Sequence, residues 1–338
     1  MRAMRNNDDN IKSETANPAN ETDRCSMSAE LAMGGQAIIE GVMMRSPHRV
    51  AMAVRTAEGD IKFESRPHVP YSKRTKFYGW PIVRGAVSMI EALVLGVGAL
   101  NWSAEHAMPP EEKKKVEGWK KNVGMGFSIF VGLALGMVLF MLIPYFFARA
   151  MGDISKNQLT FHLLAGALRI CLLLGYMILI SFWKDIRRIF QYHGSEHKSI
   201  FAYEKTGNLD VESAMAQTRF HPRCGTSFLL IVALSAIAFF AIVDTIVVAF
   251  FGQYPGAFTR FLVHLPLVPI VAGLSYEILK FSGKRMDNPI MRVLIAPGLW
   301  LQRITTQEPD EGMCEVALTA LREALPKEEP AEKSAVAA

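Results

Sequence analysis

Long apolar runs constrain this chain more than any other feature of its sequence. A helix needs about 20 predominantly apolar residues to cross a bilayer. Four runs meet that requirement, and they cover residues 123–147, 161–183, 227–251 and 261–279. The sequence therefore predicts an α-helical polytopic membrane protein with about four transmembrane helices.

A fifth, weaker apolar run covers residues 82–100 and carries Arg84 and Glu91. Its apolar residues would form one face of an amphipathic helix, a pattern typical of helices that lie in the membrane interface. We therefore expect residues 79–110 to hold an interfacial or re-entrant helix. A full crossing would carry the preceding segment over the membrane, against the basic residues of that segment.

The basic residues predict how the chain is oriented. The net charge is +5, and the cations gather before the first run, after the second run and after the fourth run. Because cytoplasmic loops carry an excess of lysine and arginine, both termini and the loop 184–226 are expected in the cytosol, with the chain multi-pass in the inner cell membrane. No basic stripe with interleaved aromatic residues is present, so we expect no nucleic-acid partner.

The segments outside these runs are predicted from pattern and composition. Apolar and polar residues alternate on both sides of Glu58-Gly59-Asp60, which predicts a half-buried hairpin and makes residues 33–78 a small cytosolic β element. A helical apolar period from Cys314 to Leu325 lies within the cytosolic C-terminal segment 280–325. The polar tails, 1–32 and 326–338, are expected to be disordered.

The residues able to do chemistry gather in the loop 184–226, which is the longest polar loop between the runs. His193, Glu196 and His197 form the pattern H-x-x-E-H, the inverted zinc-protease arrangement. Histidines at positions i and i+4 share a helical face about 6 Å apart, so both can hold one cation. Glu196 would then act as the catalytic general base. Solvated histidines on a polar helix beside the membrane are the alternative.

A second group of ligand-type residues follows in the turn FHPRCGTSF of the same loop. Histidine and cysteine are both good ligands for transition metals. Because this turn immediately precedes the third run, it lies at the same membrane boundary as the H-x-x-E-H pattern. Glu204 and Glu277 are less specific candidates. The predicted ligands of a divalent metal, most simply Zn²⁺, are His193, His197, His221 and Cys224.

Six motifs, taken in order, resemble the YqhQ-like family of bacterial membrane proteins. They are GGQAIIEGVMMRSP, YHGSEHKSIFAYE, HPRCGTSF, LPLVPIVAGLSYE, PGLWLQRITTQEP and MCEVAL, within residues 33–323. The function of this family is unknown, and its members are described as metal-dependent enzymes. Ser195 stands where the usual motif has alanine, a change between small residues. The resemblance implies a shared motif set that includes His193, Glu196, His197, His221 and Cys224.

Three functions remain open from the sequence. The first is a metal-dependent membrane enzyme of hydrolytic type, acting on a peptide, a lipid or a small molecule. The second is a non-enzymatic assembly or scaffold factor, in which a closed four-ligand site or a polar cluster fixes the loop to the bundle. The third is a transporter, indicated only by the intramembrane residues Arg169 and Asp244. The expected partner is the lipid bilayer. A protein partner or a second copy of the chain is compatible with each of the three functions.

Overall fold

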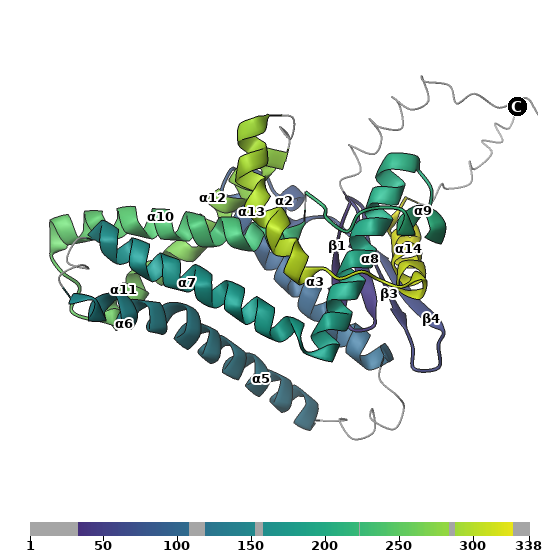
Figure 1. The fold of residues 1–338 in the computed structure, drawn as a ribbon, viewed down its shortest axis with the longest axis horizontal. Helices are drawn as coiled ribbons and strands as arrows, with labels where there is room; N and C mark the ends of the chain where they lie inside the picture. The colour runs from purple at the N-terminus through teal and green to yellow at the C-terminus, as the bar shows by residue number, and fades with distance from the viewer. Residues whose placement is uncertain (1–32, 108–118, 153–157, 223, 284–287, 327–338) are drawn as a thin grey trace, which may run out of the picture.

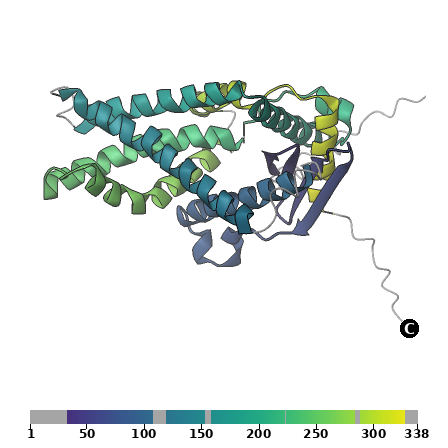
Figure 2. The same ribbon diagram turned by 90° about the horizontal axis from the view of Figure 1, so that it is seen from below.

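The computed structural model describes residues 33–107, 119–152, 158–222, 224–283 and 288–326. A small antiparallel sheet covered by helices lies at one end of the molecule, and long apolar helices extend away from it (Figure 1). A view from below shows the same division (Figure 2). The tails predicted at 1–32 and 326–338 lie, apart from Pro326, outside the described residues.

The sheet is a meander in the order β1-β2-β3-β4, as predicted for an N-terminal β element. The turn between β3 and β4 contains Gly59 with a φ of 98°, a conformation that glycine adopts without steric cost. The hairpin predicted around Glu58-Gly59-Asp60 is therefore confirmed. The strands are β1 (Gly34–Ile38), β2 (Gly41–Arg45), β3 (Arg49–Arg55) and β4 (Ile61–Pro67).

The two central strands are buried on both faces, so the expectation of a half-buried hairpin was wrong for β3. One face of the sheet packs on α14 (Glu311–Ala324), the helix predicted from the apolar period near the C-terminus. The opposite face packs on α3 (Val83–Ala107). Residues 50–54 of β3 read Val-Ala-Met-Ala-Val, a continuous apolar run typical of strands covered on both sides.

Among the described residues, five helices are long and apolar enough to cross a membrane, and four of them match the four predicted runs. These four are built from α5 and α6, α7, α10, and α11 with α12. A π-helical turn, Val138–Leu142, joins α5 to α6. The bounds are α5 (Trp119–Met137), α6 (Ile143–Ala150), α7 (Gln158–Ser181), α10 (Gly225–Phe251), α11 (Ala257–His264) and α12 (Val268–Gly283).

The fifth of these helices is α3, which is continuous and longer than the predicted run 82–100. Leu95 and Ala99 on α3 pack into the core of the sheet. Glu91 is fully buried and accepts hydrogen bonds of 2.8 Å from Arg45 and His68. Whether α3 crosses a membrane or lies at its interface stays a prediction.

Where the bundle joins the sheet, α8 (Lys184–Thr206) packs on α9 (Val211–Met215), and the chain that follows α13 (Pro289–Thr305) is hydrogen-bonded to α8. α8 packs on β1 and on α14, whereas α13 packs on α10. α8 ends at Gly207, which has a φ of 73°, because a glycine in the left-handed conformation commonly terminates a helix. This junction places the loop 184–226 beside the chain that follows α13.

Candidate metal centre

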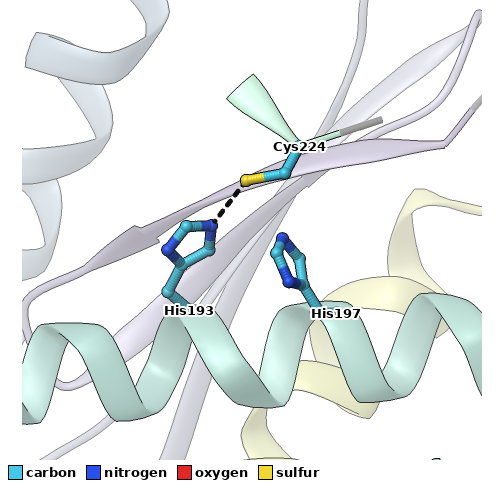
Figure 3. A group of neighbouring side chains, drawn as sticks. All are labelled: His193, His197 and Cys224. Carbon is cyan, nitrogen blue, oxygen red and sulfur yellow. Dashed lines mark hydrogen bonds between the residues drawn. The ribbon is translucent and has the colours of Figure 1, made fainter. Parts of the chain in front are cut away.

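His193, His197 and Cys224 come together at this junction (Figure 3). α8 presents both imidazoles on one side, and Cys224 faces them from the start of α10. One ligand atom from each residue lies within 4.8 Å of the others, and His193 Nε2 is 3.2 Å from Cys224 Sγ. Zinc bonds of about 2.0–2.1 Å to nitrogen and 2.3 Å to sulfur place tetrahedral ligand atoms roughly 3.3–3.6 Å apart. The distance between His193 and Cys224 agrees with this spacing, and the nitrogen of His197 lies near enough to join the two in holding a cation.

Both histidines of this cluster are oriented through Nδ1. His193 Nδ1 donates to the carbonyl oxygen of Thr305 at 2.8 Å, and His197 Nδ1 donates to that of Arg219 at 2.5 Å. Because a carbonyl only accepts, the proton of each ring sits on Nδ1 and the lone pair on Nε2. Histidines that bind metals are commonly held by such a second hydrogen bond. Among the described residues, His197 Nε2 is buried without a hydrogen-bond partner, so its lone pair is available to a ligand.

Cys224 has the surroundings of a metal-binding thiolate. It is the N-cap of α10, and its Sγ accepts from the Thr226 backbone N–H at 3.4 Å. The Thr226 hydroxyl lies 3.1 Å from the same sulfur. A backbone N–H group at the N-terminus of α10 thus points at the sulfur, and such groups favour a negatively charged partner.

Gly194 is the second residue of the H-x-x-E-H pattern and lies inside α8, although glycine lowers helix propensity. The segment that follows α13 crosses α8 at this point, and the Gln307 backbone N–H donates to the Phe190 carbonyl at 2.8 Å. A Cβ at position 194 would overlap with the carbonyl oxygen of Gln307. Glycine is therefore required by the close approach of two backbones. The hydroxyl of Ser195 donates to the Tyr192 carbonyl at 2.8 Å and takes no part in the cluster.

Glu196 is buried beside the cluster, against β1. Gly35 leaves room for it, since a Cβ at position 35 would lie 2.8 Å from Glu196 Oε1. Burial raises the pKa of Glu196, whereas the nearby imidazoles of His193 and His221 and a hydrogen bond from the Gly35 backbone N–H lower it. Among the described residues, Glu196 Oε2 has no hydrogen-bond partner. The carboxyl group is thus buried next to the histidines.

His221 lies next to the three-residue cluster rather than within it. Its ring centroid is 5.6 Å from that of His197 and 4.5 Å from that of Phe201, and its Nε2 is 3.5 Å from Glu204 Oε2. Gln302 fixes the backbone by accepting from the His221 N–H at 2.8 Å and donating to its carbonyl at 2.7 Å. Burial lowers the pKa of His221 to about 4 and also lowers the pKa of His197. Both rings are therefore neutral at pH 7, as metal binding requires.

The sequence did not identify the groups that orient the histidines. Gln302 and Thr305 lie in the motif PGLWLQRITTQEP, which carried the family resemblance but had no assigned role. The presence of this motif was the only sequence signal for a role of the segment. The Thr305 group that orients His193 is a backbone carbonyl oxygen, which no residue type specifies. Glu277, considered above as a ligand, instead pairs with Arg84 at the start of α3.

Comparisons with known proteins identify the family. A family model described as "Protein of unknown function (DUF1385)" matches residues 80–327. The uncharacterized protein YqhQ of Bacillus subtilis (strain 168) is 34% identical over 303 residues, which cover 87% of this chain and 92% of that protein. No solved structure matches the chain. The chain thus belongs to the YqhQ-like family, which carries the DUF1385 domain of unknown function.

Proposed function

We propose that the chain is a metal-dependent membrane enzyme whose cation, zinc in the first place, is held by His193, His197 and Cys224. The observation that carries the proposal is the orientation of the two histidines, with Nδ1 fixed by backbone carbonyls and Nε2 facing Cys224. Three protein ligands leave one position of a tetrahedral site open. An open position is typical of catalytic zinc sites, whereas structural sites have four protein ligands.

The residues around the cluster favour hydrolytic chemistry. When bound, zinc acts as a Lewis acid towards an oxygen of the substrate or of water. Glu196 would accept a proton and return it, because burial raises the pKa of its carboxyl group above the ordinary value and makes it a stronger base. His221 and Glu204, with Nε2 and Oε2 3.5 Å apart, form a second polar pair at the edge of the site.

The membrane arrangement that we propose has four crossings, with α3 at the interface. The sheet lies along α3: the Ser103 hydroxyl accepts from the Ile39 backbone N–H at 3.2 Å, and buried Glu91 binds Arg45. A sheet with open edges is not tolerated in lipid, which supports a position outside the hydrocarbon. Four crossings keep both termini on one side, and the loop charges favour the cytosol. The metal centre would then face the cytosol at the membrane surface.

A scaffold with a closed structural site is the competing function. It would need His221 as a fourth ligand. The ring of His221 instead packs on Phe201, and its Nε2 faces Glu204. This arrangement supports an open site over a closed one.

Elemental analysis of the full chain, purified in detergent, tests the metal centre. We expect about one zinc per chain in the wild type, as for a single tetrahedral site. The His193→Ala/His197→Ala variant should lose it. His48→Ala alters an exposed histidine and should retain the metal. Wild-type protein that stays metal-free after reconstitution with divalent ions would contradict the proposal.

X-ray absorption at the zinc edge separates the enzyme from the scaffold. Three protein ligands and one water oxygen are expected for the open site. A shell of four protein ligands that changes in His221→Ala would instead support the scaffold.

A further inference from the structure

A second cluster of charged side chains lies in the bundle, far from the metal centre. Asp244 follows Cys224 by 20 positions (244 − 224) and lies on the helix that Cys224 caps. At 1.5 Å per residue, the two positions are about 30 Å apart along α10. That distance equals the thickness of the hydrocarbon core of a bilayer, roughly 30 Å. The cluster is therefore at the opposite end of the bundle from the sheet.

Asp244 is buried and its negative charge is fully compensated. It forms an ion pair with Arg260 of α11. It also accepts from the Tyr254 hydroxyl at 2.8 Å and from His264 Nε2 at 2.7 Å, and His162 Nε2 lies 2.9 Å away. This network leaves no unpaired negative charge with which a further cation could pair.

Arg169 brings a second positive charge to the same region from α7. Its Nε donates to the Phe140 carbonyl at 2.8 Å, within the π-helical turn Val138–Leu142. Such turns occur frequently at functional sites. Among the residues that the structure describes, the Arg169 guanidinium forms no ion pair with a carboxylate.

Arg169 and Arg260 line one cavity of about 50 Å³. Such a volume holds several waters, since one water needs about 10–15 Å³. Tyr145 and Phe161 form aromatic walls, and the Arg260 guanidinium lies 4.3 Å from the centre of the Phe161 ring. Two guanidinium groups and one carboxylate leave a net positive charge within apolar helices. The Phe140 carbonyl accepts one N–H of Arg169 but carries no charge, and a bound anion would compensate the net positive charge.

We propose that this cavity binds a phosphate group, carried by an anionic lipid of the outer leaflet. The proposal rests on the membrane arrangement given above and does not depend on the metal centre. Guanidinium groups donate paired N–H bonds that match phosphate oxygens. The aromatic walls suit the glycerol and acyl parts of a lipid. Inorganic phosphate offers the same oxygens without those apolar parts.

Thermal unfolding of the full chain in a neutral detergent tests the proposal with three probes: dihexanoyl phosphatidylglycerol, dihexanoyl phosphatidylcholine and inorganic phosphate. Phosphatidylglycerol should raise the Tm saturably, as a ligand does when it binds only the folded state. Arg169→Gln should shift the midpoint of that saturation at least tenfold, while its zinc content stays at the wild-type level. Arg149→Gln removes an exposed arginine of α6 and should behave as the wild type.

The outcomes distinguish the sources of the phosphate. Equal stabilisation by inorganic phosphate would assign the cavity to free phosphate and reject the lipid. No saturable effect of any probe, or an unchanged midpoint in Arg169→Gln, would overturn the proposal. If Arg169→Gln does not fold, Ala165→Leu fills the same cavity, keeps both charges and should abolish binding. Because the zinc content of each sample is measured in parallel, failure of the metal centre is seen separately.

Discussion

Gly194, in the middle of α8, lies directly against the carbonyl oxygen of Gln307, with no room for a Cβ between them. The contact fixes the path of the chain just after α13, whose last residue, Thr305, accepts from His193 Nδ1 through its carbonyl. The glycine therefore connects the packing of two backbone segments to the orientation of one proposed ligand.

We predict that Gly194→Ala destabilises the protein by about 1–3 kcal/mol, as overpacking does. Because alanine favours the helix by about 1 kcal/mol over glycine, any loss of protein stability would come from the contact with the Gln307 carbonyl oxygen. Zinc affinity should fall because the Thr305 carbonyl moves. Denaturant unfolding and competition with a zinc chelator measure the two effects. Gly98→Ala is the control, because a Cβ there meets open space; equal behaviour of the two variants would exclude the role of the contact.

The sequence predicted the part of the metal centre that depends on local periodicity. His193 and His197 are four residues apart on α8, and Cys224 lies at the boundary of the next apolar run, so all three were expected to meet. The structure brings them together. His221 was expected with them, but its ring turns towards Phe201 and Glu204. Whether all four act as ligands stays a prediction, because side-chain direction in a turn depends on tertiary packing.

Other features depend on contacts that no local pattern encodes. Arg219 and Thr305 act through carbonyl oxygens, which every residue type supplies. His162 and His264 received no role from the sequence, and the packing of α7, α10 and α11 brings them to Asp244. The register between such helices cannot be predicted from the apolar pattern of each one. The four apolar runs, in contrast, were correctly identified as long helices because length and hydropathy alone define them.

Glu196→Gln should stabilise the metal-free protein while leaving zinc content unchanged. The carboxyl group is buried, and its Oε2 has no hydrogen-bond partner among the described residues. A neutral amide of the same shape removes the penalty of burying a charge, with an expected gain of about 1–3 kcal/mol. Denaturant unfolding after chelation measures it, with the exposed Glu64→Gln as control. A loss of stability would show that the charged carboxylate stabilises the fold, and would contradict the expected cost of burying it.

Acidification should destabilise the protein partly through His68. Burial lowers the pKa of His68, and this effect exceeds the opposing hydrogen bond to Glu91. Below about pH 6.5, the ordinary value for histidine, the unfolded chain binds the proton more readily than the folded protein. Stability therefore falls as the pH drops through that value towards the lower folded pKa. His68→Gln keeps a donor for Glu91 and should show a weaker pH dependence of Tm, whereas exposed His48→Gln should match the wild type.

Cys224→Ser should separate the helix cap from the metal ligand. Serine is a strongly preferred N-cap, so α10 should keep its first turn and the Tm of the metal-free protein should change little. The hydroxyl lacks the soft thiolate that zinc prefers, so zinc content should fall. After replacement of zinc by cobalt, the thiolate-to-cobalt charge-transfer absorption should be present in the wild type and absent in this variant. Cys171→Ser alters an exposed cysteine of α7 and should keep the absorption. If the absorption survives in Cys224→Ser, Cys224 is not a ligand and the cluster reduces to two histidines.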